Sequence, residues 1–217
     1  MQISKTLQTA TLIRDYLSTF NDLPQNPIDK GLLPVPPFKI GNDIKLIIIG
    51  QDPTIRNVKR REFIDTTLNL DKNGSLKTYI SDICAQFSIE LSNIYATNVF
   101  KYFYQKPPAD TKEVLKQHLA PNLQLLRMEL EAYPDAAVFT LGEPVLQLLI
   151  RDGVKEKVRM YWDYEKETGE SGFDFTHCRA GDNAINRDFF PFPHQPSIRK
   201  EFYKSTFGQY LEYMRAL

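Results

Sequence analysis

The chain has 217 residues, of which 42% are hydrophobic and 25% charged, a composition typical of a globular protein with a sizeable core. Its 27 basic and 27 acidic residues give a formal net charge of zero. This balance argues against a surface coated with basic charge, although it is compatible with a local basic face.

A single domain over residues 1–217 is predicted, because no Gly/Ser-rich linker or low-complexity run interrupts the chain. No apolar run reaches membrane-spanning length and the N-terminus lacks a signal-peptide pattern, so we expect no membrane segment. Cys84 and Cys178 lie far apart and form no metal-ligand pair. They fit a reducing compartment, from which we expect a cytoplasmic location and no metal or other cofactor.

Hydrophobic periodicity in the first half of the chain predicts two helices and a buried strand. Apolar residues at helical spacing cover residues 1–20, and a proline-rich, extended segment follows at residues 21–37. The continuous apolar run at residues 46–49 predicts a strand buried on both faces. A helix with one apolar face is predicted at residues 75–87.

The second half of the chain alternates strands and helices around one weakly patterned stretch. This stretch is residues 152–188, which we expect to form a hairpin or an irregular excursion. The further strands are predicted at residues 93–100, 136–141 and 189–194, and the further helices at residues 111–132, 144–150 and 199–216. Four short apolar strands separated by helices predict a three-layer α/β/α fold around a central, mostly parallel four-stranded sheet.

Polar residues follow three of the predicted strands. Asp52 comes after the strand that Gly50 ends, Asn98 lies at the end of the second strand, and His194 at the end of the last. Ligands of open α/β sheets bind beyond the carboxyl ends of the strands, so we expect these three side chains at one edge. Taken alone, Asp52 and Pro53 favour a simple turn, and an asparagine at a strand end, such as Asn98, usually forms a loop.

Two further features are compatible with contacts to phosphate. Residues 56–61 form a basic loop that contains Arg60 and Arg61, and the alternative interpretation is solvated surface charge. Its position close to Asp52 in the sequence is what suggests a phosphate-facing role. Ser75 occupies a predicted helix N-terminus, where a serine caps the helix or binds phosphate.

Short motifs recur in a characteristic order: GQDP after the first strand, GSLKTYI at the second helix, NVFKYFYQKPP at the second strand, and HQPSIR before the last helix. In this order they resemble the uracil-DNA glycosylase superfamily, from about Pro37 to Arg199. GQDP and GSLKTYI are similar to motifs of the classical enzymes, whereas NVFKYFYQKPP and the segment YPDAAVFTLGEP resemble the thermostable, iron–sulfur branch. The resemblance implies removal of uracil or a related damaged base from DNA in base-excision repair, by a monomer whose partner is DNA.

The resemblance also implies roles for particular residues. Asp52 matches the aspartate that activates the attacking water, and His194 matches the histidine that stabilises the departing uracil anion. Ile198 matches the apolar wedge that fills the place of the flipped nucleotide. The implied contacts to the base are Gln51, Pro53, Thr54, Leu68 and Asn98. The expected contacts to DNA are Arg60, Arg61, Ser75, Ser197, Ile198 and Arg199.

Three departures from the family pattern bear on substrate choice and activity. Thr54 stands where the classical enzymes have a pocket-closing tyrosine, and Leu68 stands in place of a base-stacking phenylalanine. Two cysteines are too few for a four-cysteine iron–sulfur cluster. The alternative hypothesis is therefore a catalytically weak or inactive protein of this fold that binds damaged DNA or a partner.

Overall fold

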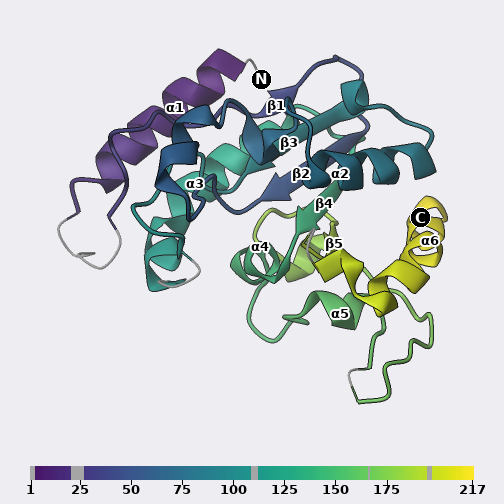
Figure 1. The fold of residues 1–217 in the computed structure, drawn as a ribbon. Helices are drawn as coiled ribbons and strands as arrows, with labels where there is room; N and C mark the ends of the chain where they lie inside the picture. The colour runs from purple at the N-terminus through teal and green to yellow at the C-terminus, as the bar shows by residue number, and fades with distance from the viewer. Residues whose placement is uncertain (1–2, 21–26, 109–111, 166, 195–196) are drawn as a thin grey trace.

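A computed structural model describes residues 3–20, 27–108, 112–165, 167–194 and 197–217, apart from the side chains of Lys112, Arg199 and Phe202. Within these ranges the chain forms a central sheet flanked by helices (Figure 1). The predicted α/β architecture is therefore confirmed. The core of the protein consists of the apolar strands and the helix faces that cover them.

The sheet contains five strands in the order β1-β3-β2-β4-β5. β2 pairs in parallel with β3 and β4, β4 pairs in parallel with β5, and β1 pairs antiparallel with β3. The predicted, mostly parallel sheet is confirmed, but the predicted count of four strands is wrong. The missed strand, β1, has two residues, which is too few to show the alternation that identifies a strand. The strands span Phe38–Lys39 (β1), Leu46–Gly50 (β2), Ile94–Asn98 (β3), Ala137–Leu141 (β4) and Phe190–Phe192 (β5).

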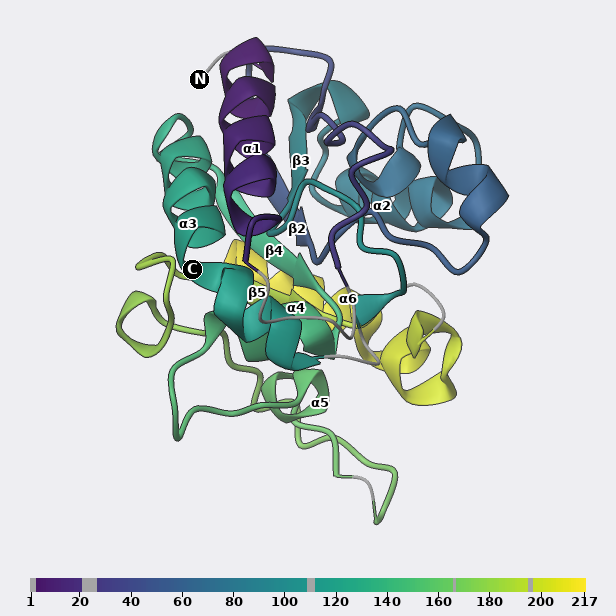
Figure 2. The same ribbon diagram turned by 90° about the vertical axis from the view of Figure 1, so that its left-hand side faces the viewer.

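Helices cover both faces of this sheet. α1 and α3 pack together on one side of the strands and α2 lies on the other side (Figure 2), where it contacts α6. None of the described helices is long and apolar enough to cross a membrane. The α-helices of the described residues span Ile3–Leu17 (α1), Ser75–Gln86 (α2), Lys112–Glu131 (α3), Glu143–Leu149 (α4), Val158–Tyr161 (α5) and Glu201–Arg215 (α6).

Residues 152–188 contribute to the core, besides forming α5 and short antiparallel bridges. Trp162 is fully buried and donates a hydrogen bond from Nε1 to the carbonyl oxygen of Pro191 at 2.8 Å. Its ring stacks on Tyr210 of α6, with ring centroids 4.0 Å apart. The segment therefore fastens β5 to α6, close to the chain that leads to His194.

A fully buried segment, Val99–Tyr104, follows β3 and links the sheet edge to the loops around it. Its first two N–H groups donate to the carbonyl oxygens of Gly50 and Gln51, both at 2.9 Å. Its last N–H donates to Thr54 Oγ1, also at 2.9 Å. The corner after β2 and the end of β3 are therefore fixed relative to each other.

Candidate functional site

The carboxyl ends of the parallel strands meet at one edge of the sheet, where three of the predicted site residues lie as expected. Asn98 ends β3, Asp52 follows β2 by two residues, and His194 follows β5 by two residues. β3 lies on one side of β2 and β4 on the other, so the strand order reverses between β2 and β4. Ligands of open α/β sheets bind at such a reversal. Neighbouring strands are about 4.8 Å apart, so β3 and β5 are separated by roughly 15 Å, enough for a small ligand.

Gly50 allows the Asn98 side chain to lie against the end of β2. The two residues are register partners in the β2–β3 pair. A Cβ atom at Gly50 would lie 2.3 Å from Asn98 Oδ1 and 3.0 Å from Leu68 Cδ2. Because these distances are too short for a real Cβ, a larger residue at this position would displace Asn98.

Asp52 and Asn98 line one cavity of about 520 Å³. This volume lies within the usual range of ligand pockets, about 300–1,000 Å³. The wall is mainly apolar and carries a few polar groups, which is also typical of ligand sites. The other lining residues are Pro53, Ile55, Arg60, Phe63, Ile64, Leu68, Asn69, Lys72 and Leu76. The structure thus brings together Asp52 with three of the residues expected to contact the base, Pro53, Leu68 and Asn98.

Asp52 is held by a local turn and is poorly solvated. Its Oδ1 accepts a hydrogen bond from the Thr54 N–H at 2.8 Å. Burial raises the pKa of Asp52 from 3.8 to about 6, and the hydrogen bonds from Thr54 and the positive charge of Arg61 offset only part of this rise. A carboxylate with a pKa near 6 is ionised at neutral pH and is also a better proton acceptor than an ordinary aspartate, as a general base requires.

Asn98 presents an unsatisfied acceptor beside the cavity. The residue is 2% exposed, and its Oδ1 has no hydrogen-bond partner within the described part of the chain. Buried polar atoms normally have a partner, so an orphaned one indicates a place for a ligand or a water molecule. The backbone carbonyl oxygen of Asn98, in contrast, accepts a hydrogen bond from Lys101 Nζ at 2.8 Å.

His194 lies at the same edge but does not line this cavity, as far as the described residues define it. It is exposed and lies next to the end of β4, because a Cβ atom on Gly142 would be 3.4 Å from His194 Cβ. Gly142 has a φ of +89°, a backbone conformation that favours glycine. Desolvation by the surrounding protein lowers the pKa of His194, so its ring is neutral at neutral pH and has one N–H to donate.

Arg60 and Arg61 are neighbours in sequence but occupy different environments. Arg60 is exposed at the cavity, where it remains available to a ligand. Arg61 is 2% exposed, so the prediction that it contacts DNA is wrong: its guanidinium is used within the fold. There it holds the loop after β2, and its positive charge lowers the pKa of Asp52, which offsets part of the rise caused by burial. Its hydrogen bonds go to three carbonyl oxygens, those of Ile55, Tyr104 and Gln105.

Gln51 and Thr54, which the resemblance links to the base, lie outside the lining of the Asp52 cavity. Gln51 lines a separate cavity of about 260 Å³ between α3 and α4. Thr54 Oγ1 accepts the hydrogen bond from the Tyr104 N–H instead of facing the cavity. The wall position expected for Thr54 is taken by the next residue, Ile55, which is 38% exposed. The shape of the cavity next to Asp52 is therefore set by Ile55.

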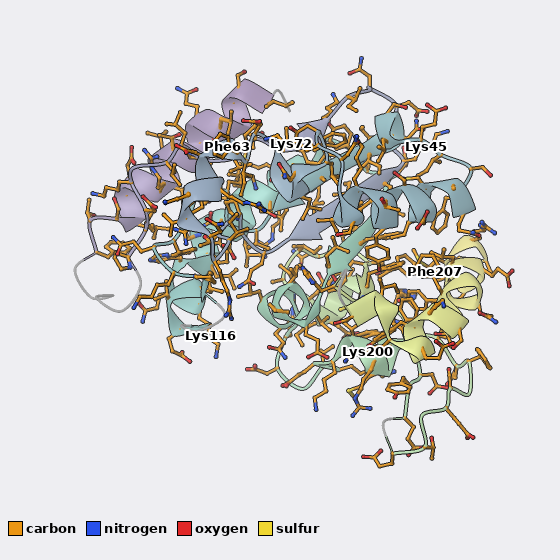
Figure 3. The ribbon with its side chains drawn as sticks, viewed as in Figure 1. Lys45, Phe63, Lys72, Lys116, Lys200 and Phe207 are labelled. Carbon is orange, nitrogen blue, oxygen red and sulfur yellow. The ribbon has the colours of Figure 1, made fainter. Side chains whose placement is uncertain are left out.

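A second groove, of about 440 Å³, brings together two of the expected DNA contacts, Ser75 and Ile198. Ser75 is the first residue of α2. Ile198 belongs to a 3-10 turn, Ser197–Arg199, whose first two N–H groups donate to the carbonyl oxygen of His194. Ser197 is half-buried, and the side chain of Arg199 lies outside the described part of the structure. Phe207 of α6, labelled in Figure 3, lines the same groove.

Phe63 and Lys72 line the Asp52 cavity and were missed by the sequence analysis. Both come from the loop between β2 and α2 and lie near each other (Figure 3). Lys72 Nζ lies 2.7 Å from Asp65 Oδ2 and donates a hydrogen bond to the Phe63 carbonyl oxygen. Phe63 is 62% exposed and thus presents an aromatic ring to a ligand. No periodic pattern marks either residue, because the loop forms short 3-10 turns instead of a longer helix.

In the described ranges, no three His, Cys, Asp or Glu residues are grouped in a way that could hold a metal ion. Cys84 and Cys178 are both free and buried. The polar groups at this sheet edge are the Asp52 carboxylate, the Asn98 amide, the His194 imidazole and the neighbouring cations.

A family model of known proteins matches most of the chain. The family model described as the uracil DNA glycosylase superfamily matches residues 38–215. This range contains all five strands and every residue that was predicted to act in the site. A search of curated proteins found no significant match.

Proposed function

The chain belongs to the uracil-DNA glycosylase superfamily, and on this premise we propose that it removes uracil or a related damaged base from DNA. Membership supports a DNA glycosylase type of function in general. The finer proposal is hydrolysis of the N-glycosidic bond of a flipped nucleotide. In it, Asp52 activates the attacking water, Asn98 recognises the base and His194 stabilises the leaving group.

The observation that carries the proposal is the cavity shared by Asp52 and Asn98. The unpartnered Oδ1 of Asn98 requires a hydrogen-bond donor, and the N3–H of uracil is such a donor. The same amide has N–H groups for a carbonyl oxygen beside N3, so a single Asn can read two adjacent groups of one base edge. The base must leave the duplex to reach this cavity, which costs a few kcal/mol and less at a mismatch.

The chemistry of the bond cleavage suits the charges of the site. When the glycosidic bond breaks, its electron pair goes to the base and positive charge develops on the sugar. Ionised Asp52 stabilises that positive charge and accepts a proton from the water that attacks the sugar. A neutral His194 donates its N–H to an oxygen of the departing base. A donor of this kind is typically worth about 3–4 kcal/mol of transition-state stabilisation.

The proposed DNA contacts combine the cavity rim with the second groove. Arg60 supplies positive charge beside the cavity, and Ser75 supplies a hydroxyl at the N-terminus of α2. Ile198 is half-buried at the groove and is proposed to insert into the duplex. Its insertion would offset part of the free energy needed to extrude the target nucleotide.

Base release from oligonucleotides that carry one uracil, one 5-substituted uracil or one hypoxanthine tests the proposal, with single and double strands compared. The wild type is expected to release base from at least one of these substrates. His194→Ala should lower the rate by about 100- to 1,000-fold, because the leaving base loses its donor. Asn98→Ala should lower it for every substrate, whereas Asn73→Ala, a change at an exposed asparagine outside the cavity, should not.

Release of no base from any substrate would contradict the enzymatic function. One observation favours a second candidate, a protein that binds damaged DNA without cleaving it. The cavity wall has Leu68 where the related enzymes have a base-stacking aromatic ring, which weakens the hold on a flipped base. Tight, salt-dependent binding of uracil-containing DNA by a wild type that shows no turnover would support this candidate.

A further inference from the structure

A charged pair lies in the core directly behind Asn98. Lys101 Nζ is 2.6 Å from Glu129 Oε2, and both side chains are 0% exposed. Lys101 belongs to the buried segment after β3, and Glu129 lies near the end of α3. Charges are almost never fully buried without a partner, and this pair is isolated from water on all sides.

The carboxylate of Glu129 is held by more than the ammonium group. Its Oε1 accepts hydrogen bonds from Tyr95 Oη at 2.6 Å and from Thr97 Oγ1 at 3.0 Å. Burial, together with the charge of Glu129, raises the pKa of Tyr95, so the phenol keeps the proton that it donates. Tyr95 and Thr97 both belong to β3, so Glu129 ties α3 to this strand at two points in addition to Lys101.

Lys101 connects this network to the proposed site. Its Nζ donates a hydrogen bond to the carbonyl oxygen of Asn98 at 2.8 Å. The next two peptide N–H groups, those of Val99 and Phe100, donate to Gly50 and Gln51 in the corner that leads to Asp52. The end of β3 is thus fixed from three sides: by Glu129 through Lys101, by the sheet, and by the corner after β2.

Stability alone does not account for such a pair. Replacing a buried ion pair by well-packed neutral residues is often neutral or stabilising, because the desolvation of two charges offsets most of their attraction. Fixed geometry is a better reason here, since the side-chain oxygen of Asn98 has no partner among the described residues to orient it. Its direction depends on its backbone, and that backbone is anchored by Lys101.

We propose that Lys101 and Glu129 are positioning residues that hold the Asn98 amide in register with Asp52 for recognition of the base. This inference rests on the proposed function. Neither residue lines the Asp52 cavity, so both act through Asn98 instead of touching the substrate.

The test uses the double substitution Lys101→Met/Glu129→Gln, the pair variant. It removes both charges together, and glutamine keeps an oxygen for Tyr95 and Thr97, so the core loses chiefly the anchor on Asn98. The matched control is Lys45→Met/Asp43→Asn, which neutralises an exposed pair of 3.3 Å at the opposite end of β2. Thermal unfolding of both variants first establishes that they are folded.

The pair variant is expected to lower kcat for base release by about 10- to 100-fold, because a misplacement of about 1 Å can cost up to about 100-fold. The KM for DNA should stay within about twofold, since the phosphate contacts lie elsewhere. The loss should largely disappear in an Asn98→Ala background, because the two changes would then affect the same interaction. Amide hydrogen exchange at Val99 and Phe100 should become about 10-fold faster.

A pair variant with the kcat of the wild type overturns the inference. A loss of kcat that simply adds to the loss caused by Asn98→Ala overturns it too. So does unchanged amide hydrogen exchange at Val99 and Phe100. If the wild type releases no base, the proposed function fails, and hydrogen exchange alone then decides the inference. Faster exchange in the pair variant only would sustain the anchoring of Asn98, and equal exchange in the wild type and both variants would refute it.

Discussion

Replacing Asp52 by asparagine is predicted to stabilise the protein at neutral pH. The carboxylate lies in surroundings that oppose its ionisation, since burial raises its pKa from 3.8 to about 6. Asparagine is neutral, has nearly the same shape and keeps an oxygen for the hydrogen bond from the Thr54 N–H. Catalytic groups often lower stability in this way, because function requires a charge where folding disfavours one.

The two pKa values give the size and the pH range of the effect. Folded Asp52 keeps its proton up to about pH 6, whereas the unfolded chain releases it near 3.8. The penalty for ionisation is therefore absent below pH 3.8, grows as the pH rises and is complete above about 6. Each pKa unit is worth about 1.4 kcal/mol, so the full penalty is about 3 kcal/mol. Asp52 is partly exposed, and screening by water reduces the expected gain to about 1–3 kcal/mol.

Urea unfolding at pH 4 and pH 7.5 measures this difference, with the fluorescence of the single, buried Trp162 as the signal. Asp52→Asn should match the wild type within about 0.5 kcal/mol at pH 4 and exceed it at pH 7.5. Asp82→Asn, at an exposed position of α2, is the control and should change little at either pH. Equal stability of the wild type and Asp52→Asn at pH 7.5, or a difference that does not vary with pH, would refute the reasoning.

Three further predictions concern the reaction and the basic loop. Asp52 acts as a general base only when it is ionised, so the single-turnover rate of uracil release should rise as the pH increases through about 6 and then level off. A rate that does not change between pH 5 and 7.5 would argue against this role. Arg60→Gln should reduce the salt dependence of DNA binding by about one phosphate contact. Lys45→Gln, which removes an exposed cation at the opposite end of β2, is the control and should change the salt dependence little. Arg61→Gln should instead lower the free energy of unfolding by about 3 kcal/mol or more, and an effect confined to DNA binding would be inconsistent with its burial.

The strands and the order of the site residues could be predicted because each depends on local sequence. Leu46–Gly50 is a continuous apolar run, and any parallel arrangement of the strands brings their carboxyl ends to one edge. The positions of Asp52, Asn98 and His194 at that edge follow directly. β1 escaped prediction because two residues carry no period, and its pairing with β3 depends on contacts distant in sequence.

The basic loop shows where sequence reasoning fails. Arg60 and Arg61 are identical in type and adjacent, yet one is exposed and the other is buried. Arg61 is the buried one because other parts of the chain bring three carbonyl oxygens to its guanidinium group. No local sequence pattern encodes these contacts. The position of Phe63 in the cavity wall is likewise not encoded by a local pattern, because it depends on how the whole loop folds over β2.

The sequence around Lys101 and Glu129 carries a signal of their burial that can be recognised once the structure is known. Lys101 interrupts the aromatic and apolar run Val99–Tyr104, and a cation within such a run needs a buried anion as its partner. Glu129 likewise lies close in sequence to the buried apolar residues Leu126 and Leu130 of α3. The sequence could therefore suggest that each charge is paired, but not that the two pair with each other.

Single-turnover release of free uracil from a uracil-containing duplex, measured by chromatography at pH 7.5, tests most directly whether Asp52 activates the attacking water. The wild type and Asp52→Asn are compared at protein concentrations that saturate the DNA, so that differences in binding do not enter. The wild type is expected to release uracil, and Asp52→Asn to do so at a rate at least about 100-fold lower. Equal rates for both proteins, or full binding of the duplex with no release by the wild type, would contradict it.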